Sequence, residues 1–208
     1  DPYGALINGK AICKGYTTTF RMFMGMLSIP CGTVHSSDAT GEEHAWNTVK
    51  LDGSWYYVDC TWDDPIPDSA ARPVIHTYFN VSREEIETDH VLPDGCPDTE
   101  SAANSYYTRS AVKIADLGEI YGAAKDALAQ DRRDFVLLFD ESTGITLDGV
   151  DAIDDIYEPE SKALEKKLNG LAAKMKKDGL ANNCFLDVRR VQTAEGIGLY
   201  VEMHLFTD

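Results

Sequence analysis

The dipeptide Asp52-Gly53 is the feature that most constrains the fold of this chain. It lies between two segments rich in aromatic and β-branched residues, 45–51 and 54–61. Asp-Gly between such runs is the strongest short-range signal for a two-residue hairpin turn, because both turn positions need a positive φ. A two-residue turn also sets the register, with Leu51 facing Ser54 and His44 facing Thr61. We therefore predict an antiparallel sheet built around this hairpin.

A helix is predicted over residues 11–27. Its apolar side chains recur at spacings of three and four residues and form one stripe. The predicted stripe consists of Cys13, Tyr16, Phe20, Phe23, Met24 and Leu27. Asn8-Gly9 interrupts the chain before this helix and Pro30 prevents its continuation.

The remaining pattern predicts two α+β domains, residues 1–104 and 105–208. In the first domain we expect a strand at 32–35 and a short helix at 82–90, with Ser82 as N-cap and Glu85 completing a capping box. Residues 92–104, rich in Pro, Gly, Asp and Ser, are typical of a long loop or a domain boundary. In the second domain the expected order is helix, strand, helix and two strands, at 112–129, 135–139, 159–177, 185–191 and 197–205.

Charge and hydropathy exclude several classes of protein. The chain carries 19 basic and 35 acidic side chains, a net charge of −16. Such a surface repels phosphate backbones and anionic lipid headgroups, so we expect neither a nucleic acid nor a membrane surface as partner. No apolar run is long enough to span a bilayer. Oligomeric state is not readable from the sequence.

Five cysteines stand at positions 13, 31, 60, 96 and 184, without a Cys-x-x-Cys pair. The odd number and the spacing fit neither a disulfide-rich scaffold nor a four-cysteine zinc site. A disulfide between Cys31 and Cys60 stays open. His35, His76, His90 and His204 show no metal-ligand spacing, and we expect structural or surface roles for them. We predict no metal and no cofactor.

Three residues carry a chemical pattern: Cys13, His44 and Asp59. The first turn of a helix favours a thiolate, and its amides can serve an oxyanion. Taken alone, Cys13 is more readily interpreted as a small buried hydrophobic residue, as most lone cysteines are. The predicted hairpin changes this view, because it places His44 and Asp59 on one face, where a carboxylate orients an imidazole beside a thiol.

The sequence segments around these residues resemble those of the bacterial transglutaminase-like superfamily. They are Asn8-Gly9-Lys10-Ala11-Ile12-Cys13-Lys14-Gly15-Tyr16, Gly41-Glu42-Glu43-His44-Ala45-Trp46-Asn47 and Trp55-Tyr56-Tyr57-Val58-Asp59-Cys60-Thr61-Trp62. The likeness covers about residues 2–90 and implies a papain-like core, in which a nucleophile helix packs on an antiparallel sheet. It implies Cys13 as nucleophile, His44 as general base and Asp59 as its orienting partner. Members of the family carry helices before the nucleophile, whereas twelve residues precede Cys13 here.

The expected activity is thiol-dependent acyl chemistry on protein or peptide amides. Water as second nucleophile gives a peptidase or deamidase, and a lysine amine gives a transglutaminase, with the same catalytic residues. Tyr16 and Trp46 are candidates for lining the substrate cleft, with core packing as the alternative for both. The resemblance also implies an extracellular or cell-surface location. The rival interpretation is a binding module that recognises a protein or cell-wall peptide without turnover.

Overall fold

The predicted hairpin forms in the computed structural model. Strand β2 (Glu43–Leu51) pairs with β3 (Ser54–Val58), and Leu51 faces Ser54 in the predicted register. Both turn residues have positive φ, 49° at Asp52 and 90° at Gly53. One detail of the prediction is wrong, because β3 ends at Val58 and the His44–Thr61 pair does not form. The Asp59 amide donates to the carbonyl of Tyr78, the residue before β4.

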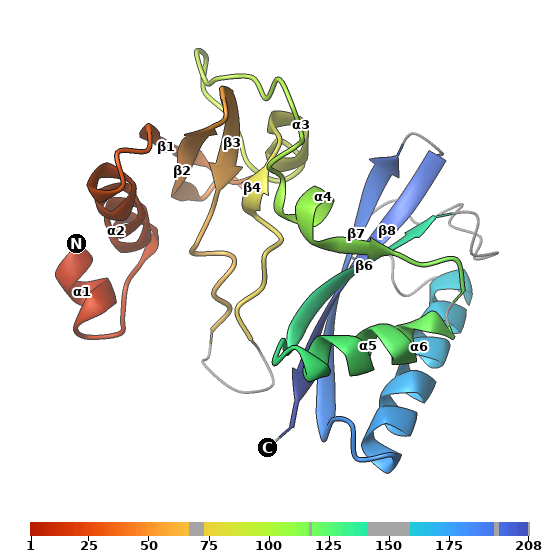
Figure 1. Cartoon of the computed structure of the whole chain (residues 1–208). Coiled ribbons are helices and arrows are strands. Elements are labelled where there is room, and N and C mark those ends of the chain that lie inside the picture. The colour runs from red at the N-terminus through yellow and green to blue at the C-terminus, as the bar shows by residue number, and fades with distance from the viewer. Residues whose placement is uncertain (67–72, 117, 141–158, 194–195, 208) are drawn as a thin grey trace. The chain divides into compact units, whose positions relative to one another are not determined.

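The structure describes residues 1–66, 73–116, 118–140, 159–193 and 196–207, and the chain divides into two units, Asp1–Arg109 and Ser110–Asp208 (Figure 1). Both units mix helices with largely antiparallel sheets, so the α+β class is confirmed. Unit 1 contains a sheet of order β1-β2-β3-β4. Its further elements are α1 (Pro2–Leu6), α2 (Cys13–Met26), β1 (Cys31–Ser37), β4 (Phe79–Val81), α3 (Arg83–Ile86) and α4 (Tyr106–Ser110).

Helix α2 covers the predicted range but buries a different set of side chains. Its buried residues are Gly15, Thr17 and Thr19. Phe23 and Leu27 of the predicted stripe are 42% and 65% exposed. Gly15, Thr17 and Thr19 let the helix backbone come close to the sheet, and the threonine hydroxyls donate to carbonyls about one turn earlier, while Phe20 and Met24 of the predicted stripe pack against the sheet.

Two apolar clusters hold unit 1 together, one on each face of its sheet. Val49, Tyr56 and Val58 form one, with Phe20 and Met24 of α2 packed against it. The other contains Trp46 and Tyr57 and receives Ile86 from α3. The predicted capping box at the start of α3 is present, with reciprocal bonds between Ser82 and Glu85. Helix α2 therefore packs on one face of the sheet and helix α3 on the other, each through its own apolar cluster.

Unit 2 has a four-stranded sheet of order β5-β6-β8-β7. Its elements are β5 (Ala111–Lys113), α5 (Glu119–Ala129), β6 (Asp134–Asp140), α6 (Pro159–Lys177), β7 (Asn183–Thr193) and β8 (Gly196–Phe206). The helix predicted at 112–129 is wrong at its beginning, where residues 111–113 form a strand parallel to β6. A separate core, including Ile120, Leu137 and Val201, joins the helices to this sheet. Within the described ranges, no helix has the length and apolar character to cross a membrane.

Candidate active site

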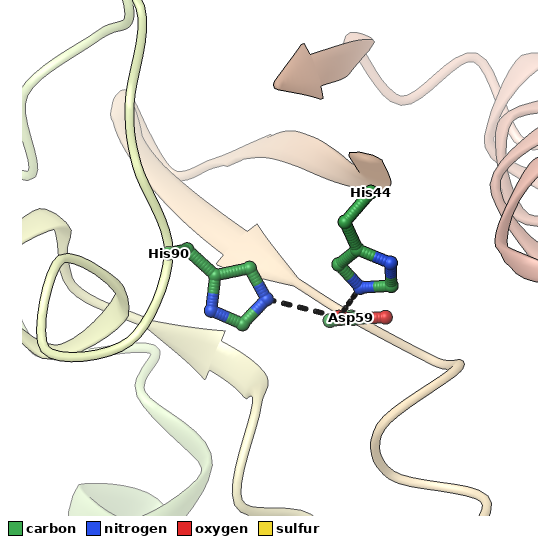
Figure 2. A group of neighbouring side chains, drawn as sticks. All are labelled: His44, Asp59 and His90. Carbon is green, nitrogen blue, oxygen red and sulfur yellow. Dashed lines mark hydrogen bonds and ion pairs between the residues drawn. The ribbon is translucent and has the colours of Figure 1, made fainter. Parts of the chain in front are cut away.

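Asp59 is the centre of a buried polar cluster just past the end of β3. Its Oδ1 accepts the backbone amides of Thr61 and Trp62 at 2.9 and 3.3 Å. Its Oδ2 lies 2.5 Å from Nε2 of His44 and 3.0 Å from Nε2 of His90. Figure 2 shows the two imidazoles directed at this one carboxylate. One oxygen therefore fixes the side chain to the loop, and the other oxygen binds both rings.

His44 is the second residue of β2, and its side chain is 9% exposed. A carboxylate only accepts hydrogen bonds, so the proton of His44 must sit on Nε2. The other ring nitrogen, Nδ1, is then the atom available as a base. The ring stacks on Trp46 and Trp62, with centroids 5.8 and 5.3 Å apart. These contacts hold the imidazole in one orientation.

The electrostatics of the cluster keep Asp59 ionised. Its side chain is 1% exposed, and burial alone would raise its pKa. The hydrogen bonds from His44 and His90 outweigh burial and lower the pKa of Asp59 to about 2. A stable carboxylate at this position can fix the tautomer of His44 and support its protonated form.

His90 is the residue that sequence reasoning missed, because we expected a structural or surface role for it. Its ring is fully buried and lies between two carboxylates, Asp59 at Nε2 and Asp89 at Nδ1, the latter at 2.6 Å. It is 31 residues from Asp59 and follows α3, so no short-range spacing connects them. The available signal was the capping box at Ser82, which fixes the helix that precedes this histidine.

Cys13 is the first residue of α2 and is partly buried. Helix α2 packs against β1 and β2. The Asn47 side-chain amide of β2 donates to the carbonyls of Thr17 in α2 and Gly32 in β1, at 3.2 and 2.9 Å. In the described part of the chain, no hydrogen bond joins the Cys13 thiol to His44. The structure thus brings His44 and Asp59 together and sets Cys13 on a helix fastened to the same strand.

None of the other four cysteines is the first residue of a helix. All five thiols are free, so the Cys31–Cys60 disulfide left open by the sequence is not formed. Burial raises the pKa of Cys31, Cys96 and Cys184, and that of Cys60 to about 12. Each of these four thiols is therefore held more firmly in its unreactive protonated form.

The two residues proposed to line a substrate cleft have other surroundings. Trp46 is completely buried, and its ring packs in the core beside His44 and His90. Tyr16 is partly buried, and its hydroxyl donates to Asp64 in the loop after β3. That bond ties α2 to the segment that carries Asp59.

Within the described ranges, His44, Asp59 and His90 form a group whose donor atoms, all within 4.8 Å of one another, are close enough to hold a metal ion. Ligand atoms on one tetrahedral zinc ion are about 3.3 Å apart, given bonds near 2.05 Å. The 2.5 Å between His44 Nε2 and Asp59 Oδ2 is shorter than that separation and is a hydrogen bond. We interpret the cluster as a hydrogen-bonded one.

Comparison with known proteins supports the resemblance to the transglutaminase-like superfamily. The chain is 30% identical to Kyphoscoliosis peptidase of Mus musculus and 32% identical to that of Homo sapiens, over 88 residues in each case. The match covers 37% of this chain, and the chain spans 13% of the length of either relative. Residues 1–60, which include Cys13, His44 and Asp59, match the family model of the transglutaminase-like superfamily. These matches support that superfamily for the N-terminal part of the chain.

Proposed function

We propose that this protein carries out thiol-dependent acyl chemistry on protein or peptide amides, with Cys13 as nucleophile, His44 as base and Asp59 as its orienting partner. The observation that carries the proposal is the His44–Asp59 hydrogen bond, since it leaves Nδ1 of His44 as the free base in a unit whose helix begins at Cys13. Peptide hydrolysis is the favoured reaction, because both curated relatives are named peptidases.

In the proposed reaction, the Cys13 sulfur attacks the carbonyl carbon of an amide while Nδ1 of His44 takes the thiol proton. The C–N bond then breaks, and His44 delivers that proton to the leaving amine. Water, activated by the same imidazole, attacks the thioester, releases the acid and restores the thiol. A lysine amine in place of water would give transamidation from the same intermediate.

The test is residue-specific alkylation. We expect iodoacetamide to modify Cys13 faster than the other four thiols, because those four have raised pKa values and none of them begins a helix. Peptide mapping by mass spectrometry measures each rate in the native protein. Cys13→Ala should abolish cleavage of a peptide library, and Cys184→Ala is the matched control that should keep it.

Three outcomes would contradict the proposal. Faster alkylation of Cys31 or Cys184 would remove the basis for choosing Cys13. Equal loss of cleavage in the two alanine variants would show that the reaction does not depend on Cys13 in particular. A Cys13 that reacts no faster than a free thiol in solution would support the binding module instead.

A further inference from the structure

His90 stands in the cluster as a buried ring with an acidic partner on each nitrogen. Asp59 Oδ2 is 3.0 Å from its Nε2 and Asp89 Oδ1 is 2.6 Å from its Nδ1. A neutral imidazole has one N–H and one lone pair, so one of these contacts would set a lone pair against a carboxylate oxygen. Only the imidazolium, with a proton on each nitrogen, makes two favourable hydrogen bonds here.

Every group that packs on His90 is compatible with this charge. The titratable groups that face it are Asp59, Asp89, His44 at 5.5 Å between ring centroids, and Tyr78 at 5.3 Å. Tyr78 donates its hydroxyl to Asp89, which holds that carboxylate in place. The Asp38 backbone bridges to His90, but its carboxylate accepts bonds from Thr40 and Glu42 instead.

Aromatic rings complete the surroundings of His90. Trp62 lies 4.3 Å and Trp46 4.7 Å from its ring centre, both close enough for a favourable interaction between a cation and a π system. Burial works against the charge, yet the two carboxylates raise the pKa of His90 above its ordinary value. Both the contacts of His90 and its raised pKa therefore indicate that its ring is a buried imidazolium cation.

We propose that His90, as an imidazolium held between Asp59 and Asp89, is a positioning residue that orients Asp59 toward His44 and limits the negative charge that the thiol–imidazole pair experiences. This inference rests on the proposed function for its catalytic consequence. With His90 charged, the group Asp59–His90–Asp89 carries one net negative charge. Without that cation it carries two, and the added negative charge disfavours the thiolate form of Cys13.

The decisive variant is His90→Gln, whose amide can still donate to Asp59 but cannot carry charge. We expect the pH profile of Cys13 alkylation to move to higher pH, by about half a unit or more, because one positive charge is lost from the cluster. We also expect a rate at neutral pH reduced about threefold or more, since such a shift lowers the thiolate fraction. His35→Gln removes an exposed histidine of β1 and is the matched control, with an unchanged profile.

A second measurement reads the charge of His90 directly and does not depend on activity. In ¹⁵N NMR spectra of the wild-type protein at pH 7.0, both ring nitrogens of His90 should carry protons. Asp89→Asn should lower the pH at which His90 loses one of them. A neutral His90 in the wild-type protein would overturn the inference, as would an unchanged alkylation profile in a folded His90→Gln variant. If Cys13 of the wild-type protein shows no enhanced reactivity, the proposed function fails while the NMR result still decides the state of His90.

Discussion

At the scale of single residues, the two oxygens of Asp59 have different roles. Oδ1 binds the loop amides of Thr61 and Trp62, and Oδ2 binds the two imidazoles. The segment Asp-Cys-Thr-Trp therefore orients its own aspartate, because the backbone amides of its last two residues donate to that carboxylate. The charge of Asp59 is then available to His44 and His90.

The first prediction concerns the stability that this charge provides. Since the pKa of Asp59 is lowered to about 2, its ionised form stabilises the fold fully above the unfolded pKa of about 4, and this contribution is lost as the pH falls through 2. Asp59→Asn should therefore lower the free energy of unfolding at pH 7 by about 2 kcal/mol. Urea unfolding followed by tryptophan fluorescence at pH 7, 4 and 2 measures the difference.

The difference between the two proteins should shrink between pH 4 and 2, where the carboxylate of Asp59 takes up a proton in the folded protein. A difference that stays constant down to pH 2 would show that Asp59 contributes packing or neutral hydrogen bonds only.

At the scale of elements, helix α2 depends on a close contact at Gly15. A methyl group added there would lie 2.6 Å from Cβ of Ala11, a separation that real Cβ atoms do not show. Gly15 is the third residue of the helix, so the segment that must move is the one leading into Cys13. The same helix contains Gly25, where an added Cβ meets nothing within 4 Å.

The second prediction is that Gly15→Ala and Gly25→Ala act in opposite directions. Gly15→Ala should destabilise unit 1 by about 1–3 kcal/mol through overpacking and slow the alkylation of Cys13. Gly25→Ala should stabilise it by up to about 1 kcal/mol, because alanine restricts the unfolded chain and fits the helix. Thermal melts followed by tryptophan fluorescence compare the pair. Equal melting temperatures would mean that Ala11 yields without cost and that α2 tolerates displacement at its start.

At the scale of the whole molecule, the sequence predicted what local patterns determine. The Asp52-Gly53 register, the capping box at Ser82 and helix α6 at its full length, Pro159–Lys177, all follow from neighbouring residues. The three-residue strand β5 could not be recognised, because its pairing partner β6 is separated from it in the sequence by helix α5. His90 was missed for the same reason, since tertiary contacts alone connect it with Asp59.

The two units have separate cores, and this leads to the third prediction. All three tryptophans, Trp46, Trp55 and Trp62, lie in unit 1, so their fluorescence reports the unfolding of that unit alone. Val201→Ala removes two methyl groups from the core of unit 2, at a cost of about 2 kcal/mol. We expect it to lower the melting temperature in circular dichroism while the fluorescence transition and the alkylation rate of Cys13 stay unchanged. Val49→Ala, in the core under α2, is the matched variant and should lower the fluorescence transition. Should Val201→Ala shift that transition as well, the units would unfold as one, and the candidate site would depend on both.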